Sequence, residues 1–233
     1  MSANFEYDGR VVLVTGACGA LGSAVCEAFD AAGASVHATD VIDVESEDSL
    51  LDPDRVEFHR GDLTDEDDVE RVVEAVVDSA GRLDYLANVA GTWMGGQPID
   101  ETDLSEFETV LDVNLKSAFL VSKHALPHLR ETDGAIVSVS ARASLKGGEG
   151  DGPYRASKAG VRLLTETLAE ENRGTVRANC VMPSVIDTPA NREMMDPKEE
   201  WVDPADIAEV FLVLCSDATG PTSGAAVPVY GEA

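Results

Sequence analysis

The stretch RVVLVTGACGALG, residues 10–22, joins a short apolar run to a glycine-rich turn, and a segment of small residues continues from it through Phe29. The β-branched residues of the run favour a buried strand, and the order of strand, glycine turn and helix is typical of a dinucleotide-binding fold. Glycines let the backbone approach a pyrophosphate, which the N–H groups and dipole at a helix N-terminus favour. The residues expected to form this phosphate-binding turn are Thr15, Gly16, Gly19, Ala20, Leu21 and Gly22.

An acidic residue ends the next expected strand, residues 34–40. Asp40 follows the glycine turn at close to the offset of about 20 residues at which a carboxylate binds the adenosine ribose hydroxyls of NAD. The same carboxylate repels the 2′-phosphate of NADP. The sequence therefore predicts NAD as the cofactor, with NADP less favoured.

A second pattern, Y-x-x-x-K, lies in PYRASKAG, residues 153–160. Residues four apart share one face of a helix, so Tyr154 and Lys158 should point into the same space. A nearby cation favours the phenolate and lowers a tyrosine pKa from its usual value of about 10 toward neutrality. This pattern makes Tyr154 a candidate general acid/base, and the alternative is a chance pair on an amphipathic helix.

These two patterns, together with four further segments in the same order, resemble the short-chain dehydrogenase/reductase family over almost the whole chain. The resemblance implies that Lys158 also holds the nicotinamide ribose and that Asn114 anchors a water leading from Lys158 toward solvent. Asn114 is accordingly counted with Tyr154 and Lys158 in the expected catalytic group. The further cofactor-binding residues that the resemblance implies are Asp62 and Leu63 at the adenine, Asn88, Ala90 and Gly91 after the fourth strand, and Pro183 and Thr188 at the nicotinamide carboxamide.

The sequence departs from the family pattern at four positions, which are Ala20, Val89 and Ser184 in the cofactor motifs and Ala141 in the catalytic group. Ala141 occupies the position of the family's catalytic serine, whereas Ser140 and Ser144 lie nearby but out of register. The dihydropteridine reductases carry alanine at this position while keeping the tyrosine and the lysine. The segments similar to that branch are residues 141–160, 187–195 and 224–231.

Strands alternate with helical stretches along the rest of the chain. This order predicts right-handed βαβ units in an α/β fold of the Rossmann type, a doubly wound parallel seven-stranded sheet with helices on both faces. Residues 1–233 are expected to form a single domain. Thr64 with Asp67 resembles a capping box, Pro204 should begin the last helix, and residues 189–203 could form a lid over substrate. The expected strands cover residues 10–15, 34–40, 55–59, 83–89, 134–140, 175–182 and 225–230.

The chain carries 44 acidic against 17 basic residues, a net charge of −27. Nucleic acid is excluded as a partner because phosphate binding needs a basic surface. Dense like charge destabilises a compact state unless salt screens it, so we expect a high-salt cytoplasm, as for halophilic proteins. No apolar stretch is long enough to span a membrane and no signal peptide is recognised, which predicts a cytoplasmic protein. The family resemblance implies a homotetramer or homodimer.

Two histidines four apart, His124 and His128, could chelate a metal on one helix face, but Ala125 replaces the glutamate of H-E-x-x-H. The acidic runs 43–54 and 64–70 do not fit the EF-hand spacing. The sequence therefore predicts no metal site. Of the four cysteines, Cys18 lies in the phosphate turn, where a helix N-terminus lowers thiol pKa values. The candidate pocket walls are Trp93, Met94, Met194, Met195 and Trp201.

The function expected from these features is reversible hydride transfer between a nicotinamide ring and a small carbonyl, alcohol or quinonoid substrate, with Tyr154 moving the proton. One alternative is an ordinary alcohol, sugar or 3-oxoacyl reductase in which Ser140, Ser144 or a water replaces the missing serine. Another is a non-catalytic NAD-sensing protein on the same fold. A sensor would not need the Tyr154, Lys158 and Asn114 group, which is complete here.

Overall fold

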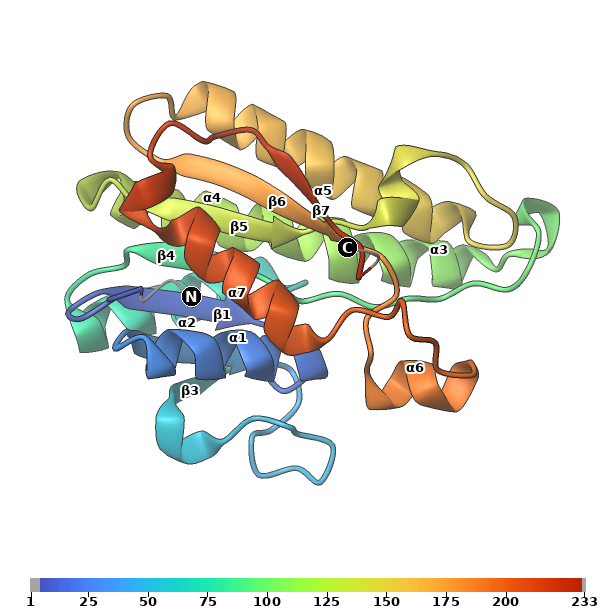
Figure 1. The fold of residues 1–233 in the computed structure, drawn as a ribbon, viewed down its shortest axis with the longest axis horizontal. Coiled ribbons are helices and arrows are strands. Elements are labelled where there is room, and N and C mark those ends of the chain that lie inside the picture. The colour runs from blue at the N-terminus through green and yellow to red at the C-terminus, as the bar shows by residue number, and fades with distance from the viewer. Residues whose placement is uncertain (1–4, 232–233) are drawn as a thin grey trace.

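One parallel sheet with the strand order β3-β2-β1-β4-β5-β6-β7 forms the centre of the molecule (Figure 1). The computed structural model describes residues 5–231, so the ends of the expected 1–233 domain lie outside the described residues. All seven expected strands are confirmed and differ from the prediction only at their ends. They are β1 (Val11–Thr15), β2 (Ser35–Asp40), β3 (Glu57–Arg60), β4 (Tyr85–Asn88), β5 (Ala135–Val139), β6 (Arg177–Pro183) and β7 (Ala226–Val229).

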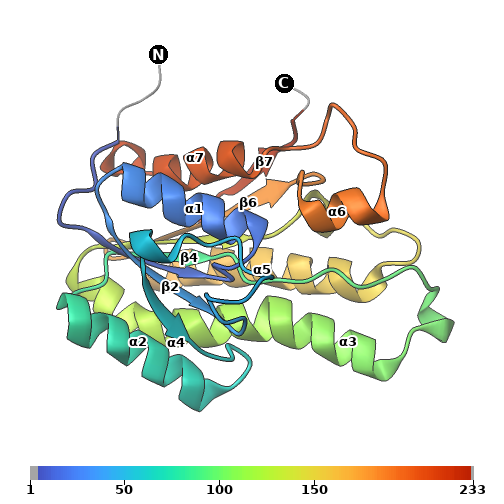
Figure 2. The ribbon, with the colours of Figure 1, turned by 90° about the horizontal axis from the view of Figure 1, so that it is seen from below.

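Helices cover both faces of this sheet (Figure 2), which confirms the doubly wound single-domain fold. Helices α1 and α7 pack together on one face, and α2, α4 and α5 pack on the other. In the described part of the chain, none of the helices combines the length and the apolar character needed to cross a bilayer. The α-helices are α1 (Ala20–Ala31), α2 (Glu66–Ala80), α3 (Leu104–Leu111), α4 (Ser117–Glu131), α5 (Gly152–Glu171), α6 (Pro189–Met194) and α7 (Pro204–Cys215).

The apolar run of β1 is continuous because each of its faces meets a different core. Val12 and Val14 belong to the core under α1 and α7, which includes Phe29 and Phe211. Leu13 points the other way, into the core under α2, α4 and α5. A strand buried on both faces does not alternate polar and apolar residues, and its sequence reads as an unbroken hydrophobic segment.

The strand order reverses between β1 and β4. From β1 the chain first builds β2 and β3 on one side, then crosses to β4 and continues outward on the other side. Loops leaving the carboxyl ends of neighbouring strands therefore diverge there, and ligands of open α/β sheets bind in the crevice that results. This reversal predicts that the ends of β1 and β4 flank the functional site.

Two local predictions differ from the structure. Helix α2 is capped by the Asp65 carboxylate, which accepts a hydrogen bond from the backbone N–H of Asp68, so the expected capping box at Thr64 is wrong by one residue. The Thr64 hydroxyl instead donates to an Asp62 oxygen at 2.8 Å. The stretch 189–203 is not wholly irregular, because Thr188 caps the short helix α6 there. Pro204 begins α7 as predicted.

Candidate active site

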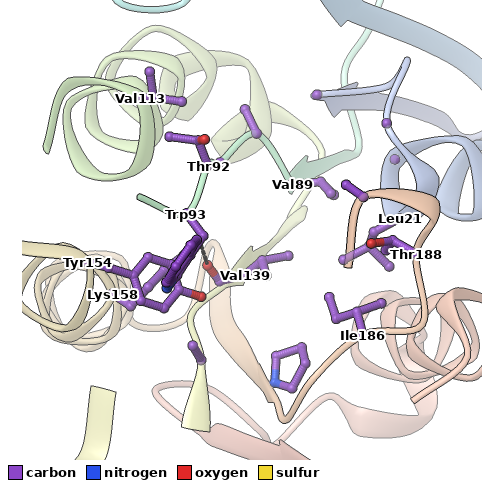
Figure 3. Close-up of a pocket in the computed structure, with 18 of the residues that line it drawn as sticks. Leu21, Val89, Thr92, Trp93, Val113, Val139, Tyr154, Lys158, Ile186 and Thr188 are labelled. Atoms are coloured by element: carbon purple, nitrogen blue, oxygen red, sulfur yellow. Dashed lines mark hydrogen bonds between the residues drawn. The ribbon is translucent and has the colours of Figure 1, made fainter. Parts of the chain in front are cut away.

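A cavity of about 1180 Å³ lies at the carboxyl ends of the strands. It exceeds the roughly 300–1,000 Å³ of most small-molecule pockets and offers room for a dinucleotide together with a substrate. Figure 3 shows Tyr154 and Lys158 on one side of it, and Leu21, Ile186 and Thr188 across from them. The predicted site residues in its lining are Gly16, Gly19, Ala20, Leu21, Gly22, Asp40, Asp62, Leu63, Ala90, Gly91, Tyr154, Lys158, Pro183 and Thr188.

The glycine turn between β1 and α1 has the shape needed to receive a pyrophosphate. A Cβ atom on Gly22 would lie 2.0 Å from the carbonyl oxygen of Gly16, so only glycine fits where the helix crosses the turn. Gly19 is the N-cap of α1 and Ala20 is its first residue, which turns the helix N-terminus toward the cavity. The missing glycine at Ala20 is tolerated because helical backbone at this position accepts a methyl group.

Three predicted site residues lie behind the lining and hold it in place, and two of them support the segment 88–91. The Thr15 hydroxyl accepts hydrogen bonds from the backbone N–H groups of Val89 and Ala90, both at 3.0 Å. The Asn88 amide donates to the Ser122 hydroxyl at 3.0 Å. Thr15 and Asn88 therefore position the backbone after β4 and do not line the cavity themselves.

Asn114 is the third of these residues and lies in a π-helical turn, Asp112–Lys116, between α3 and α4. Its amide oxygen accepts from the backbone N–H of Thr92 at 2.7 Å, and its nitrogen donates to the Ser157 hydroxyl at 2.9 Å. A Cβ atom on Gly91 would lie 2.9 Å from both the Asn114 oxygen and the Lys158 ammonium. Glycine at position 91 therefore allows α5 and the π-helical turn to meet beside the cavity.

Asp40 ends β2 at the rim of the cavity, as the sequence predicts. Its two carboxylate oxygens accept hydrogen bonds from the backbone N–H groups of Cys18 and Ile42, each at 3.0 Å. These bonds fix the carboxylate beside the phosphate turn. Each oxygen retains a second lone pair for a ribose hydroxyl.

The expectation of a low thiol pKa at Cys18 is wrong. The side chain is fully buried in the core beneath α1, and its sulfur lies 3.6 Å from the carbonyl oxygen of Ile42. Burial, followed by the negative charge of Asp40, raises the pKa of this thiol despite a lowering hydrogen bond from Ser49. Helix α1 begins two residues later, at Ala20, so Cys18 lies outside it.

The central pair lies on one face of α5, and both of its members line the cavity. Lys158 is 4% exposed, and its ammonium donates to the carbonyl oxygen of Val139 at 3.0 Å. Burial lowers the pKa of Lys158 to about 8. Burial, with a smaller contribution from Asp151, raises the pKa of Tyr154 to about 12. The prediction that Lys158 lowers this pKa is therefore wrong.

Ala141 stands at the position of the absent catalytic serine, and Ser140 beside it also belongs to the cavity lining. Ala141 lines the cavity at the end of β5. The Ser140 hydroxyl is buried and donates to the carbonyl oxygen of Lys158 at 2.8 Å, while the Ser144 hydroxyl lies 3.8 Å from the Met182 sulfur. Each of the two hydroxyls thus already has a partner within the protein.

Several lining residues are absent from the sequence prediction. Ser184 lies in the lining, and its buried hydroxyl makes no hydrogen bond within residues 5–231. Three basic side chains, Arg142, Lys146 and Arg155, belong to the same wall of the cavity. Basic residues are rare in this acidic chain, so their clustering near Tyr154 in the sequence could have identified them as site residues.

Of the five apolar wall candidates, Trp93, Met194 and Met195 line the cavity and leave about half of their surface exposed. Met94 does not belong to the lining. Trp201 is 9% exposed and lies outside the cavity, where packing accounts for it.

The chain is similar to known proteins along nearly its whole length. The sequence pattern described as short chain dehydrogenase matches residues 10–199. The 3-oxoacyl-(acyl-carrier-protein) reductase of Thermotoga maritima is 33% identical, over 97% of this chain and 98% of that protein. The meso-2,3-butanediol dehydrogenase of Serratia marcescens is 32% identical, over 98% and 96%.

A solved structure, the ligand-free aldohexose dehydrogenase of Thermoplasma acidophilum, superposes with a TM-score of 0.87 at 26% identity and covers 99% of this chain and 94% of its own. The protein belongs to the short chain dehydrogenase family and is an oxidoreductase of that type. Membership implies a nicotinamide cofactor, NAD or NADP.

Proposed function

We propose that this protein is an NAD-dependent reductase of a small carbonyl or quinonoid compound, with Tyr154 as the proton donor. The observation that carries the proposal is that Tyr154 and Lys158 line one continuous cavity with the phosphate turn. A dinucleotide bound at that turn would extend toward α5, where Tyr154 and Lys158 lie beside the space left for substrate.

The nicotinamide ring, when bound, supplies or accepts the hydride. Tyr154 gives its phenolic proton to the substrate oxygen or nitrogen, or takes that proton back in the reverse direction. Its pKa of about 12 keeps the phenol protonated at neutral pH, which suits the reductive direction. Lys158, in the same cavity lining as Tyr154, would offer a cation to the nicotinamide ribose.

Two features support NAD over NADP. The fixed carboxylate of Asp40 would accept hydrogen bonds from ribose hydroxyls and repel a 2′-phosphate. Asp62 adds a second acidic residue to the same end of the cavity, after β3. Every lysine and arginine of the lining lies between residues 142 and 158, on the opposite wall, where none of them would pair with a 2′-phosphate.

The substrate we favour is an activated quinonoid ring system of the dihydropterin type. Ala141 offers no hydroxyl to a developing oxyanion, and the exposed Trp93, Met194 and Met195 give flat and adaptable apolar walls. The relatives named above favour the second candidate, an ordinary ketone or 3-oxoacyl reductase. Turnover of the two substrate types decides between them.

We further propose a cytoplasmic homotetramer or homodimer with small-molecule substrates. Helices α3, α4 and α5 carry exposed apolar side chains, at Leu104, Phe107, Phe119 and Leu163, on the segments that flank the Asn114 and Tyr154 positions. Burial of such side chains against a second copy would remove apolar surface from water. Light scattering of the purified chain tests the assembly.

The experiment for the proposed function combines a substrate screen with Tyr154→Phe. NADH and NADPH are each tested with quinonoid dihydropterin, sugars and 3-oxoacyl thioesters, and NADH should bind more tightly than NADPH. Tyr154→Phe should keep NADH binding and lose at least about a hundredfold in turnover, the scale of a lost general acid. The control is Tyr85→Phe, which removes a phenol outside the cavity and should leave turnover unchanged. A Tyr154→Phe enzyme with a tenth of wild-type turnover contradicts the role.

A further inference from the structure

Two histidines and a glutamate meet at the edge of the sheet, outside the cavity already described. His37 on β2 lies in register with Glu57 on the edge strand β3, and His59 follows two residues later on β3. The His37 Nδ1 and His59 Nε2 atoms are 3.0 Å apart. The Glu57 oxygens lie 3.9 Å from the first and 3.8 Å from the second.

The three side chains share one face of the sheet because registered residues of parallel strands, and residues two apart on a strand, point the same way. This face is covered by α2, whose Ser79 hydroxyl donates to Glu57 Oε2 at 2.7 Å. The side chain of His37 is 2% exposed and that of His59 11%, while the Glu57 side chain is 51% exposed. Solvent ions therefore reach the group from the Glu57 side.

Both imidazoles are held in the form that binds metals. Burial is the main cause that lowers the pKa of His37 and of His59, against the opposing effect of the Glu57 charge. A neutral imidazole has a lone pair for a metal, and a carboxylate supplies a negative oxygen. Among residues 5–231, His37, Glu57 and His59 form the one group of three such side chains whose donor atoms all lie within 4.8 Å of one another.

We propose that His37, Glu57 and His59 bind a divalent late first-row transition ion, for which Zn²⁺ is the reference. Zinc takes imidazole nitrogens at about 2.0–2.1 Å, so two nitrogens 3.0 Å apart can both bind one ion at an angle of about 90°. The exposed Glu57 carboxylate, whose oxygens lie 3.8 and 3.9 Å from the two nitrogens, would move closer to complete a three-ligand set, and water would fill the fourth position. The mixed nitrogen and oxygen donor set favours this class of ion over Mg²⁺ or Ca²⁺, which prefer oxygen alone.

The ion would serve as a clip between strands. It would join the edge strand β3 to β2 at a point three residues before Asp40, on the strand that carries the adenosine-side carboxylate into the cavity. Because a bound metal stabilises only the folded state, Zn²⁺ should raise the melting temperature of the protein.

The test is a calorimetric titration of the full-length protein with Zn²⁺ in excess Mg²⁺, which saturates weak carboxylate sites on this acidic surface. The wild type should bind one equivalent and melt at a higher temperature with Zn²⁺. His59→Gln and Glu57→Gln should each lower the affinity by more than the roughly tenfold to hundredfold lost when only a supporting residue is removed.

The matched control is His124→Gln, which removes a histidine 3.2 Å from the Glu66 carboxylate, an acid that Lys123 also binds. This variant should bind Zn²⁺ as the wild type does. Equal Zn²⁺ affinity in the wild type, His59→Gln and Glu57→Gln would overturn the proposal. So would the absence of a stoichiometric site in the wild type, which would leave His37 and His59 as a hydrogen-bonded pair.

Discussion

At the scale of single residues, burial of the Lys158 ammonium destabilises the folded protein. Its pKa of about 8 in the folded protein compares with 10.5 for an ordinary lysine. Below pH 8 the group is charged in both states, so folding must bury a cation. Between pH 8 and 10.5 the folded state releases the proton, and stability rises with pH by about 1.4 kcal/mol for each unit of pKa difference.

This sign gives a prediction for Lys158→Met. The free energy of unfolding of the variant, relative to that of the wild type, should be greatest at pH 7 and should decline as pH rises toward 10. Urea unfolding of both proteins at a series of pH values measures this difference. Taking the difference between the two free energies of unfolding cancels the contribution of the tyrosines, which titrate in both proteins. A difference that is constant with pH would mean that the ammonium is not penalised by burial.

A second residue-scale prediction concerns Ala141→Ser. Removing a hydrogen-bond donor from an oxyanion typically costs about 2.7–4 kcal/mol of barrier, so an enzyme specialised for simple ketones would gain from the serine. For a quinonoid substrate, the variant should leave turnover unchanged or lower and should raise weak activity on simple ketones. Steady-state kinetics on both substrates measures this. A large gain on the best native substrate would favour the ordinary carbonyl reductase instead.

Residue types and spacing predicted which side chains would surround the cavity, and they predicted less well what those side chains would do there. The lining includes Tyr154, Lys158 and Asp40 as expected. The pKa of Tyr154 was mispredicted because burial is a property of the folded neighbourhood, whereas the spacing of a motif reports only proximity to a cation. The pairing of His37 with His59 was missed because it depends on the register of two strands.

At the scale of elements, the end of the sheet opposite the cavity is held by Asp84, directly before β4. Its carboxylate is fully buried and accepts hydrogen bonds from the Arg10 and Arg82 guanidinium groups and from the backbone N–H of Val11. Burial alone would raise the pKa of this carboxyl, but the hydrogen bonds from Arg82, Arg10 and Val11 outweigh it and lower the pKa. One side chain thus ties the start of β4 to the start of β1.

Asp84→Asn should therefore lower the free energy of unfolding by about 1.5–3 kcal/mol, the scale of a hydrogen bond to a charged group. The loss should be largest at neutral pH and should shrink as acid protonates the wild-type carboxylate. Urea unfolding measures it. The control is Glu170→Gln, because the exposed Glu170 and Arg173 pair should contribute less than about 0.5 kcal/mol. Equal losses in the two variants would contradict the role of Asp84.

Helices and strands were largely predictable, because apolar periodicity and glycine turns act locally. The N-cap of α2 was predicted at Thr64, whereas Asp65 occupies it. Threonine and aspartate are both good N-cap residues, so residue type alone does not distinguish the two positions. The π-helical turn that contains Asn114 was not predicted from the sequence. Asn114 in this turn makes hydrogen bonds with Thr92 and Ser157, which are distant in sequence and cannot be predicted from a local pattern.

At the scale of the whole molecule, the net charge of −27 dominates the response to salt. The Debye length falls from roughly 30 Å at 0.01 M to 3 Å at 1 M, so salt removes repulsion between distant carboxylates. The melting temperature should rise over that range. Glu45→Lys with Glu47→Lys, on an exposed loop, should raise it at low salt and reduce the dependence on salt. A melting temperature that is flat or falls with salt in the wild type would contradict adaptation to high salt.

Because the strand order reverses between β1 and β4, the two sides of the cavity come from different parts of the sequence. The part before β4 contributes the phosphate turn and the ends of β2 and β3, and the part from β4 onward contributes residues within 89–93, 113–117, 139–158 and 183–195. Mutations that alter substrate choice can therefore accumulate in the later part while the residues that face the pyrophosphate stay unchanged. Grafting residues 189–195 from a relative should therefore change substrate choice, because the graft leaves Pro183, Thr188 and the phosphate turn in place to hold the cofactor.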